Sequence, residues 1–202
     1  MGKTEITVQV YDDINNIKKQ LVSLGYKETE EFTGSDYYFS TLNKNEINNA
    51  SYKDLLSSSI IVRSFKTKGK TGLNNYMVFK NKTLDENNNV ISEEKISTKI
   101  DNLENTLKIL KYSNLNNWLN LCQQNAFYKL GEIVITVGTV KGLSGSFIEI
   151  EEYESIKNLS SEEKISKLLS LAKSLGFEIS EDYSIKKAYM LFKQQNNENE
   201  NI

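Results

Sequence analysis

The segment GLSGSFIEIEEYE, residues 142–154, carries the most informative pattern in this chain. Apolar and acidic residues alternate along it, so Ile148 and Ile150 leave one face of a strand while Glu149 and Glu151 leave the other. Two carboxylates placed two residues apart on one face can share a divalent cation. The segment therefore predicts a strand with an apolar back and an acidic front that could hold a metal.

The acidic front has two interpretations. Alternation alone favours an ordinary sheet whose charged face lies in water. If the sheet closes into a barrel, the same face lines the lumen. Other predicted strands place Glu5, Arg63 and Lys80 on their polar faces, so ionisable groups of both signs would meet inside such a barrel.

Composition restricts the class of protein. The chain has 202 residues, 38% of them hydrophobic, which predicts a folded single domain over residues 1–193 followed by a polar, disordered tail at 194–202. With 25 basic and 27 acidic residues, the net charge of −2 argues against a nucleic-acid or anionic-membrane partner. No segment has the apolar length that spans a bilayer.

The absence of certain residue types excludes several chemistries. The chain contains no histidine, which excludes Ser-His-Asp and Cys-His catalysis and His-ligated zinc. The single cysteine, Cys122, excludes an intramolecular disulfide and is typical of a reducing cytoplasm. Its apolar neighbours predict that Cys122 is buried and structural. Any catalysis must therefore use carboxylates, Lys, Arg, Tyr or a hard cation such as Mg²⁺ or Mn²⁺.

Periodicity predicts an α+β fold with about eight largely antiparallel strands and four or five flanking helices. Strand patterns cover residues 4–11, 26–32, 35–42, 59–65, 76–82, 90–100, 125–140 and 144–154. Helical patterns cover residues 14–24, 48–58, 101–124 and 160–175, with a last helix around 185–192. Ser160 and Glu163 form the sequence signature of a capping box at the start of the fourth helix.

Four of these strands resemble, in order, the strands of the CYTH superfamily, which includes class IV adenylyl cyclases, thiamine triphosphatases and inorganic triphosphatases. The matching segments are EITVQ (5–9), IIVRSF (60–65), YMVFKNK (76–82) and GLSGSFIEIE (142–151), and the resemblance covers residues 3–193. It implies an antiparallel β-tunnel whose charged lumen binds a triphosphate-bearing small molecule.

The resemblance also implies roles for individual residues. Acids of the tunnel would hold Mg²⁺ or Mn²⁺, at Glu5, Glu149 and Glu151. Cations would hold phosphate oxygens, at Arg63 and Lys80. Glu94 matches a further acid on the fourth strand. A homodimer is left open by the sequence.

The chain departs from the family pattern at five positions. Neutral residues replace an acid and a Lys at Thr7 and Gln9, a Lys-x-Arg pair at Gln123 and Asn125, and an Asp at Gly138. Loss of a preorganised charge contact lowers catalysis more than binding. The sequence therefore leaves two functions open: a metal-dependent triphosphatase, acting on inorganic or thiamine triphosphate, or a catalytically impaired binding protein. Cyclisation of ATP is the third alternative.

Overall fold

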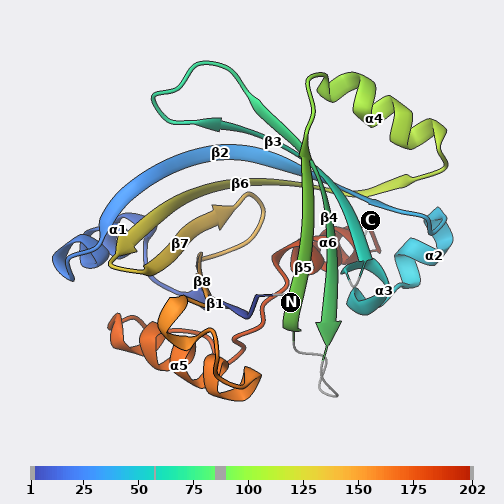
Figure 1. Cartoon of the computed structure of the whole chain (residues 1–202). Coiled ribbons are helices and arrows are strands. Elements are labelled where there is room, and N and C mark those ends of the chain that lie inside the picture. The colour runs from blue at the N-terminus through green and yellow to red at the C-terminus, as the bar shows by residue number, and fades with distance from the viewer. Residues whose placement is uncertain (1–2, 57, 85–89, 201–202) are drawn as a thin grey trace.

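The computed structural model describes residues 3–56, 58–84 and 90–200. Eight antiparallel strands form one sheet in the order β1-β8-β7-β6-β2-β3-β4-β5, and the sheet curls into a half-barrel (Figure 1). The predicted α+β fold is confirmed. The strands are β1 (Glu5–Val10), β2 (Lys27–Ser40), β3 (Ser58–Thr67), β4 (Asn74–Leu84), β5 (Val90–Lys99), β6 (Asn116–Leu130), β7 (Ile133–Val140) and β8 (Ser146–Glu151).

Six α-helices and one 3-10 turn flank the sheet. They are α1 (Ile14–Ser23), α2 (Lys44–Asn49), α3 (Tyr52–Leu56), α4 (Leu103–Tyr112), α5 (Ser161–Ser174), α6 (Lys187–Glu200) and η1 (Glu154–Ile156). The capping box predicted for α5 is confirmed, since the side chains of Ser160 and Glu163 each accept the other's backbone N–H. None of the described helices is long and apolar enough to cross a membrane.

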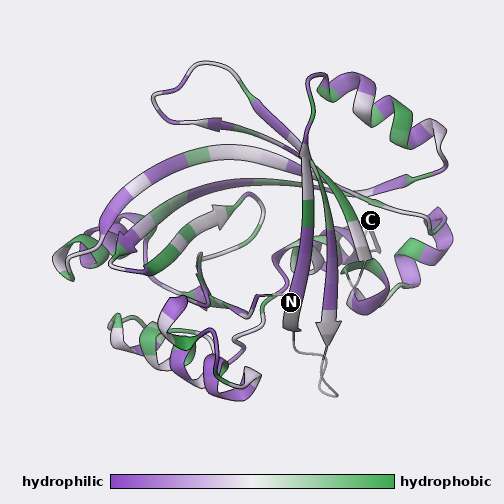
Figure 2. Cartoon of the chain, viewed as in Figure 1, coloured by the Kyte–Doolittle hydropathy of each residue, from purple (hydrophilic) through white to green (hydrophobic). Residues whose placement is uncertain are grey.

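The helices cover the sheet through three hydrophobic cores. One core packs α1 and α5 against strands β1, β6, β7 and β8, and it buries Ile148 and Ile150. The second joins α2, α3 and α6 to β6, and the third packs α4 against β2 and β3. Hydrophobic residues alternate with hydrophilic ones along the strands (Figure 2), which leaves ionisable side chains on the concave face.

The two edges of the sheet are linked at one end. The backbone of Lys3 exchanges two hydrogen bonds with that of Glu93, of 3.2 and 3.3 Å, which joins the β1 end of the sheet to β5. The segment before α6 then pairs with the free side of β1, where the Thr7 amide donates to the Tyr183 carbonyl at 2.8 Å. These contacts cover an edge that would otherwise be open.

The predicted helix over 101–124 is wrong in its second half. Helix α4 ends at Tyr112, Asn114 adopts a left-handed conformation with φ of 60°, and β6 begins two residues later. Pairing of β6 with β2 along most of its length outweighs the helical spacing of Trp118 and Leu119. Cys122, predicted to be buried, is exposed on this strand.

Other predicted elements also have different bounds. The strand predicted at 125–140 is the end of β6 and the whole of β7, which pair antiparallel. The two strands predicted at 26–32 and 35–42 are one strand, because Gly34 marks a close approach to β3 and not a turn. A Cβ at Gly34 would lie 2.6 Å from the Phe65 Cβ. The helix predicted at 48–58 is two short helices, α2 and α3.

The end of the chain also differs. Helix α6 continues to Glu200, through most of the tail for which the sequence predicted disorder; residues 201–202 lie outside the described part. The single domain over 1–193 stays a prediction.

Candidate functional site

A cavity of about 210 Å³ lies on the concave face of the sheet. Its walls come from all eight strands and from the start of α6, so residues far apart in sequence meet there. Five carboxylates line it, namely Glu5, Asp36, Glu93, Glu149 and Glu151. Six cations line it as well, namely Arg63, Lys80, Lys82, Lys95, Lys186 and Lys187. The lining therefore carries an excess of one positive charge.

The structure brings five of the six predicted site residues together. Glu5, Arg63, Lys80, Glu149 and Glu151 all line the cavity. Glu94 is exposed on β5, and its neighbour Glu93 lines the cavity instead, because successive side chains of a strand leave opposite faces. The acid of β5 that faces the cavity is therefore one residue away from the predicted position.

Arg63 is held by a bidentate ion pair with Asp36. The guanidinium donates from Nε and from Nη2 to the two carboxylate oxygens, at 2.7 and 2.6 Å. Burial disfavours the charged guanidinium, but Asp36 outweighs this effect and raises the pKa of Arg63. Gln123 donates a further hydrogen bond of 3.1 Å to Asp36, which is only 1% exposed. The orientation of Arg63 is therefore fixed before any ligand binds.

Glu93 holds two lysines of the neighbouring strand. Its oxygens lie 2.8 Å from Lys80 Nζ and 3.2 Å from Lys82 Nζ. Burial disfavours ionisation of Glu93, but the two lysines outweigh it and lower the pKa of Glu93 to about 2. This cluster, called here the Glu93 cluster, holds two ammonium groups on one wall of the cavity.

The two acids of the opening sequence motif have different partners. Glu149 Oε1 lies 2.6 Å from Nζ of Lys187, the first residue of α6. Burial opposes ionisation of Glu149, but Lys187 with Lys80 and Arg63 lowers its pKa. Glu151 pairs with Lys3 at 3.2 Å, and its side chain is 55% exposed. Glu149 therefore lies inside the cavity, whereas Glu151 lies at its rim.

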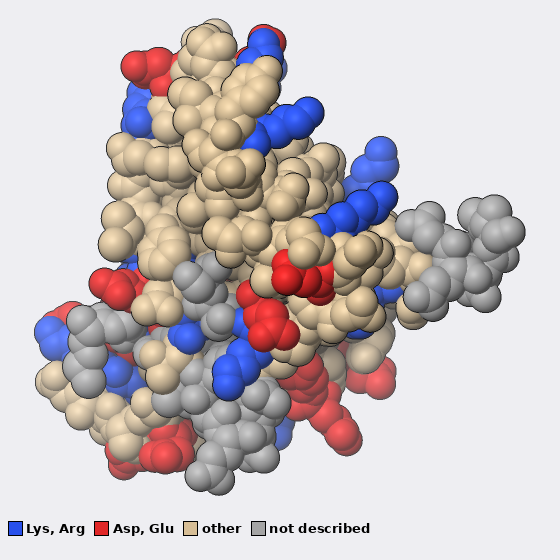
Figure 3. All heavy atoms as spheres, turned by 90° about the vertical axis from the view of Figure 1, so that its right-hand side faces the viewer, with Lys and Arg blue, Asp and Glu red and all other residues tan. Residues whose placement is uncertain are grey.

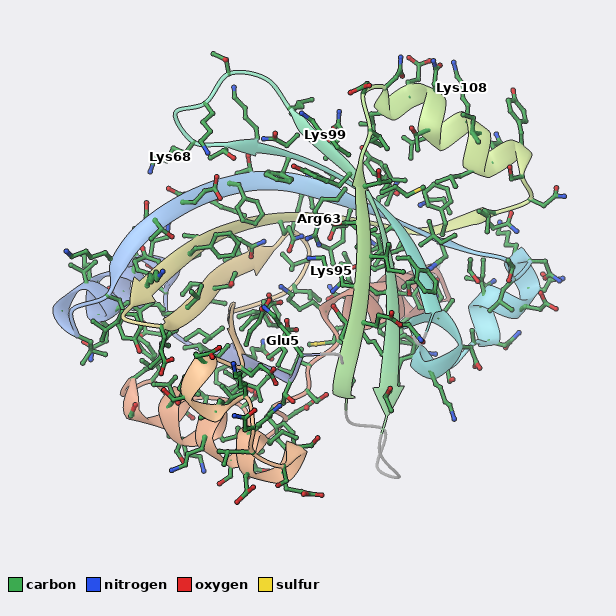
Figure 4. The ribbon with its side chains drawn as sticks, viewed as in Figure 1. Glu5, Arg63, Lys68, Lys95, Lys99 and Lys108 are labelled. Atoms are coloured by element: carbon green, nitrogen blue, oxygen red, sulfur yellow. The ribbon has the colours of Figure 1, made fainter. Side chains whose placement is uncertain are left out.

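Glu5 and Lys95 line the cavity and form no ion pair with another described residue. Burial, reinforced by the nearby Glu149 carboxylate, raises the pKa of Glu5 to about 7. Burial, with the charges of Lys80 and Arg63, lowers the pKa of Lys95. Figure 4 places Glu5, Arg63 and Lys95 within the curl of the sheet, while Lys68 and Lys108 lie outside it. The carboxyl group of Glu5 and the amino group of Lys95 are therefore available to bind a ligand.

The donor set suits a hard cation only in part. Within the described residues, no group of three or more acids or cysteines is arranged to hold a metal, so the predicted set of three acids is not assembled. Glu5 and Glu149 are nevertheless close enough for one carboxylate to raise the pKa of the other. Mg²⁺ commonly uses one or two carboxylates and completes its shell with water and phosphate oxygens. Glu5 and Glu149 fit that kind of site.

The neutral replacements have specific surroundings. Thr7 and Asn125 line the cavity, while Gln9 lies outside the lining and donates to the Ser144 carbonyl at 2.9 Å. Gly138 leaves room for Asn125, because a Cβ at Gly138 would lie 1.8 Å from Asn125 Oδ1. That oxygen is buried and has no hydrogen-bond partner among the described residues. The Asp of the family pattern is therefore replaced by a space that the amide of Asn125 fills.

Several lining residues were not identified from the sequence. Alternation from Lys80 could have identified Lys82, and antiparallel register opposite Arg63 could have identified Asp36. Lys187 could not be found in this way, because its position depends on the long return of the chain along β1.

Comparisons with known proteins agree with this architecture. No protein-family model matches the chain. It is 26% identical over 191 residues to a candidate adenylate cyclase of Methanocaldococcus jannaschii, a match that covers 94% of this chain and 97% of that protein. It superposes on a protein of Pyrococcus horikoshii OT3 with a TM-score of 0.68 at 17% identity, over 95% of this chain and 98% of the other. The chain has the fold of the CYTH superfamily.

A further structure with the CYTH fold is an adenylyl cyclase candidate from Hippeastrum, described as having a dominant triphosphatase activity. It superposes with a TM-score of 0.61 at 13% identity and covers 96% of both chains. The resemblance predicted from four strand motifs is thus confirmed for the fold. The activity described for the Hippeastrum protein belongs to that protein.

Proposed function

We propose that the cavity binds a triphosphate-bearing small molecule together with Mg²⁺ or Mn²⁺ and that the protein hydrolyses the bound triphosphate. One observation carries the proposal: carboxylates and cations from different strands of a curled sheet converge on one cavity. The acids Glu5 and Glu149 come from β1 and β8, while Arg63, Lys80 and Lys95 come from β3, β4 and β5. This division suits an anion held between cations and a metal.

The charge of the cavity supports a role for a divalent cation. The lining has an excess of one positive charge, whereas a triphosphate carries several negative charges at neutral pH. A divalent ion at Glu5 and Glu149 would neutralise charge on the phosphate oxygens. On the face shown in Figure 3, basic and acidic side chains of the described residues are interspersed, so phosphate binding depends on the cavity and not on a basic surface.

The residues of the chain would act mainly by positioning. Two N–H groups of Arg63 are occupied by Asp36, and the guanidinium keeps further donors for a phosphate oxygen. Lys80 and Lys82 are fixed by Glu93, so little side-chain entropy is lost when a phosphate binds. Lys95, which has no ion pair with a described residue, adds a cation from the next strand. In hydrolysis, water adds to a phosphorus atom and a phosphate leaves, and these cations would stabilise the charge that develops.

The second candidate function is binding without turnover. The neutral Gln123 and Asn125 favour it, because they stand where the family pattern has two cations. An amide can donate a hydrogen bond to a phosphate, so its replacement of a cation weakens catalysis more than binding. Cyclisation of ATP is a third candidate, supported only by the names of the relatives.

An assay of the purified protein separates these functions. Tripolyphosphate, thiamine triphosphate and ATP would each be tested with Mg²⁺ and with Mn²⁺, and thermal unfolding would be followed in parallel. The Glu5→Gln, Glu149→Gln double variant is expected to lose turnover by about 100-fold or more. Glu162→Gln, on the exposed first turn of α5, is the matched control and should leave turnover unchanged.

Each outcome of the assay has a definite meaning. Turnover that depends on Glu5 and Glu149 supports the triphosphatase. A raised unfolding temperature with tripolyphosphate but without turnover supports the binding protein. Neither turnover nor a thermal shift would contradict both functions.

A further inference from the structure

Strand β5 forms an open edge of the sheet over residues 94–99. In the strand order its one neighbour is β4. On its other side, the described part of the chain supplies only the short backbone pairing of Lys3 with Glu93. All six residues from Glu94 to Lys99 are exposed. An edge of this kind presents backbone N–H and C=O groups that can pair with another strand.

The backbone groups that point outward from β5 belong to its odd-numbered residues. The Ile100 amide donates to the Asn75 carbonyl of β4 at 3.0 Å, so the even-numbered residues bond to β4. Glu93 bonds outward to Lys3 instead. Because the two directions alternate along an antiparallel strand, the outward groups that remain are those of Lys95, Ser97 and Lys99.

An apolar row on the face opposite the cavity ends at this edge. Phe39, Ile60, Phe79 and Ile96 lie opposite one another on the successive strands β2, β3, β4 and β5. Phe39 belongs to the third hydrophobic core and is 4% exposed, whereas Ile96 is 60% exposed. The row therefore runs from a buried phenylalanine to an isoleucine in contact with solvent.

Charge restricts how a second copy of the chain could pair with this edge. Antiparallel pairing about a two-fold axis places one residue of β5 opposite its own copy. A register centred on residue 95, 97 or 99 sets Lys95 or Lys99 opposite a lysine. A register centred on residue 96 sets Lys99 opposite Glu93, whose outward groups already bond to Lys3. Thr98 is the centre between residues 95 and 99 that avoids both conflicts.

We propose that two copies of this chain associate through antiparallel pairing of their β5 edges, with Thr98 opposite its own copy. In this register the outward backbone groups of Ser97 exchange hydrogen bonds with those of Lys99 of the second copy. Lysines on an edge strand ordinarily oppose pairing, and here they exclude the competing registers. The two curled sheets then continue into each other.

The side chains of the edge complement themselves in the same register. Ile96 lies opposite Ile100 of the second copy, so the apolar row continues across the junction. Lys95, which forms no ion pair with another described residue, lies opposite Asp101 of the second copy, directly after the end of β5. Cross-strand pairs of these two kinds stabilise a sheet. So short an edge buries less area than a permanent interface, and a dissociation constant on the order of 10 µM is expected.

Sedimentation velocity between roughly 1 and 100 µM protein tests whether the dimer forms. The wild-type protein is expected to shift from one to two chains over this range. Ser97→Pro removes an outward N–H and leaves the bonds to β4 intact, so it should stay folded and monomeric. Val22→Lys is the matched control, because Val22 is 58% exposed on α1, away from β5 (Figure 1), and it should dimerise like the wild type. Thermal unfolding checks that each variant is folded.

Disulfide crosslinking tests the register. The exposed Cys122 is first replaced by Ser. Thr98→Cys should then crosslink into a dimer under mild oxidation, because directly opposed residues of this kind have Cα atoms about 4.5 Å apart, within the reach of a disulfide. Ile96→Cys should not, since four residues of strand, roughly 13 Å, separate it from its own copy. Val22→Cys measures crosslinking by random collision.

Three results would overturn the proposal. The first is a wild-type protein that stays monomeric up to about 100 µM. The second is a dimer that Ser97→Pro leaves unchanged, which would place the interface elsewhere. The third is crosslinking of Ile96→Cys in place of Thr98→Cys, which would refute the register. None of these measurements depends on a phosphate ligand, so the proposed function is tested separately.

Discussion

Two carboxylates in this protein each hold a pair of lysines, yet they lie on opposite faces of the sheet. Glu31 on β2 accepts from Lys18 at 2.8 Å and from Lys68 at 2.5 Å on the outer face. Glu93 on β5 holds two lysines of β4 inside the cavity, as described above. The pKa of both carboxyl groups is lowered to about 2. The local chemistry is thus nearly the same.

The difference lies in what adjoins each cluster. Hydrogen bonds from Lys18, Lys68 and Gln124 account for the lowered pKa of Glu31, so this carboxylate is fully satisfied on the outer face. Glu93 is no more buried than Glu31, since their side chains are 14% and 9% exposed, but it lies in a cavity with Glu5 and Lys95, which have no ion pair with a described residue. An ion cluster that satisfies itself stabilises a fold. An ion cluster that lies in a cavity beside unpaired charges is suited to binding a ligand.

The largest expected difference concerns stability. Arg63→Met would leave the buried Asp36 carboxylate without its cation, and breaking a buried pair in this way costs about 3–5 kcal/mol. Lys18→Met leaves Glu31 paired with Lys68 and hydrogen-bonded to Gln124, so a smaller loss is expected. Urea unfolding, compared at equal m-values, measures both losses. A loss in Arg63→Met no larger than that in Lys18→Met would contradict the buried character of the cavity pair.

A smaller effect is expected in the dependence of stability on pH. The pKa of Glu31 falls from 4.5 to about 2 on folding, so its stabilisation is present above about pH 4.5 and is lost as pH falls through 2. Glu31→Gln should therefore lower the free energy of unfolding by roughly 1–2 kcal/mol at pH 6 after screening of the exposed Lys68, and by little near pH 2.

The corresponding variant of the cavity cluster sharpens this comparison. Glu93→Gln should change the pH dependence of unfolding about as much as Glu31→Gln does, because both pKa values fall from 4.5 to about 2 on folding and already include the cost of burial. Unfolding experiments between pH 2 and pH 6 measure both variants, and a pH dependence that Glu93→Gln leaves unchanged would contradict the ion pairs of Glu93 with Lys80 and Lys82.

The comparison also shows how much of this molecule could be predicted from its sequence. Alternation in strands has a period of two, so the faces of Glu149 and Ile150 could be assigned directly, and the predicted residues Glu5, Arg63 and Lys80 do line the cavity. The exact position of a side chain along a strand is harder to predict. On β5 the sequence predicted Glu94 as the acid of the site, whereas Glu93 lines the cavity. The helix predicted over 101–124 failed because pairing with β2 extends the sheet into a segment with helical spacing.

What could not be predicted depends on contacts between distant segments. The sequence does not reveal that α6 brings Lys187 to Glu149. The two residues are 38 positions apart, and their contact depends on the return of the chain along the edge of β1. It also does not reveal that Glu31 and Glu93 differ in function, because both are acids in strands rich in charge. Only the curl of the sheet separates the outer face from the cavity.

The most direct test of the account compares one lysine from each cluster. Tripolyphosphate binding in Mg²⁺ would be measured by calorimetry for Lys80→Met and for Lys68→Met, which remove matched cations from the Glu93 cluster and from Glu31. Lys80→Met is expected to weaken binding by roughly 10- to 100-fold, the range for loss of a charged hydrogen bond, and Lys68→Met by less than about twofold. Equal affinities in the two variants would contradict the assignment of the cavity as the phosphate site.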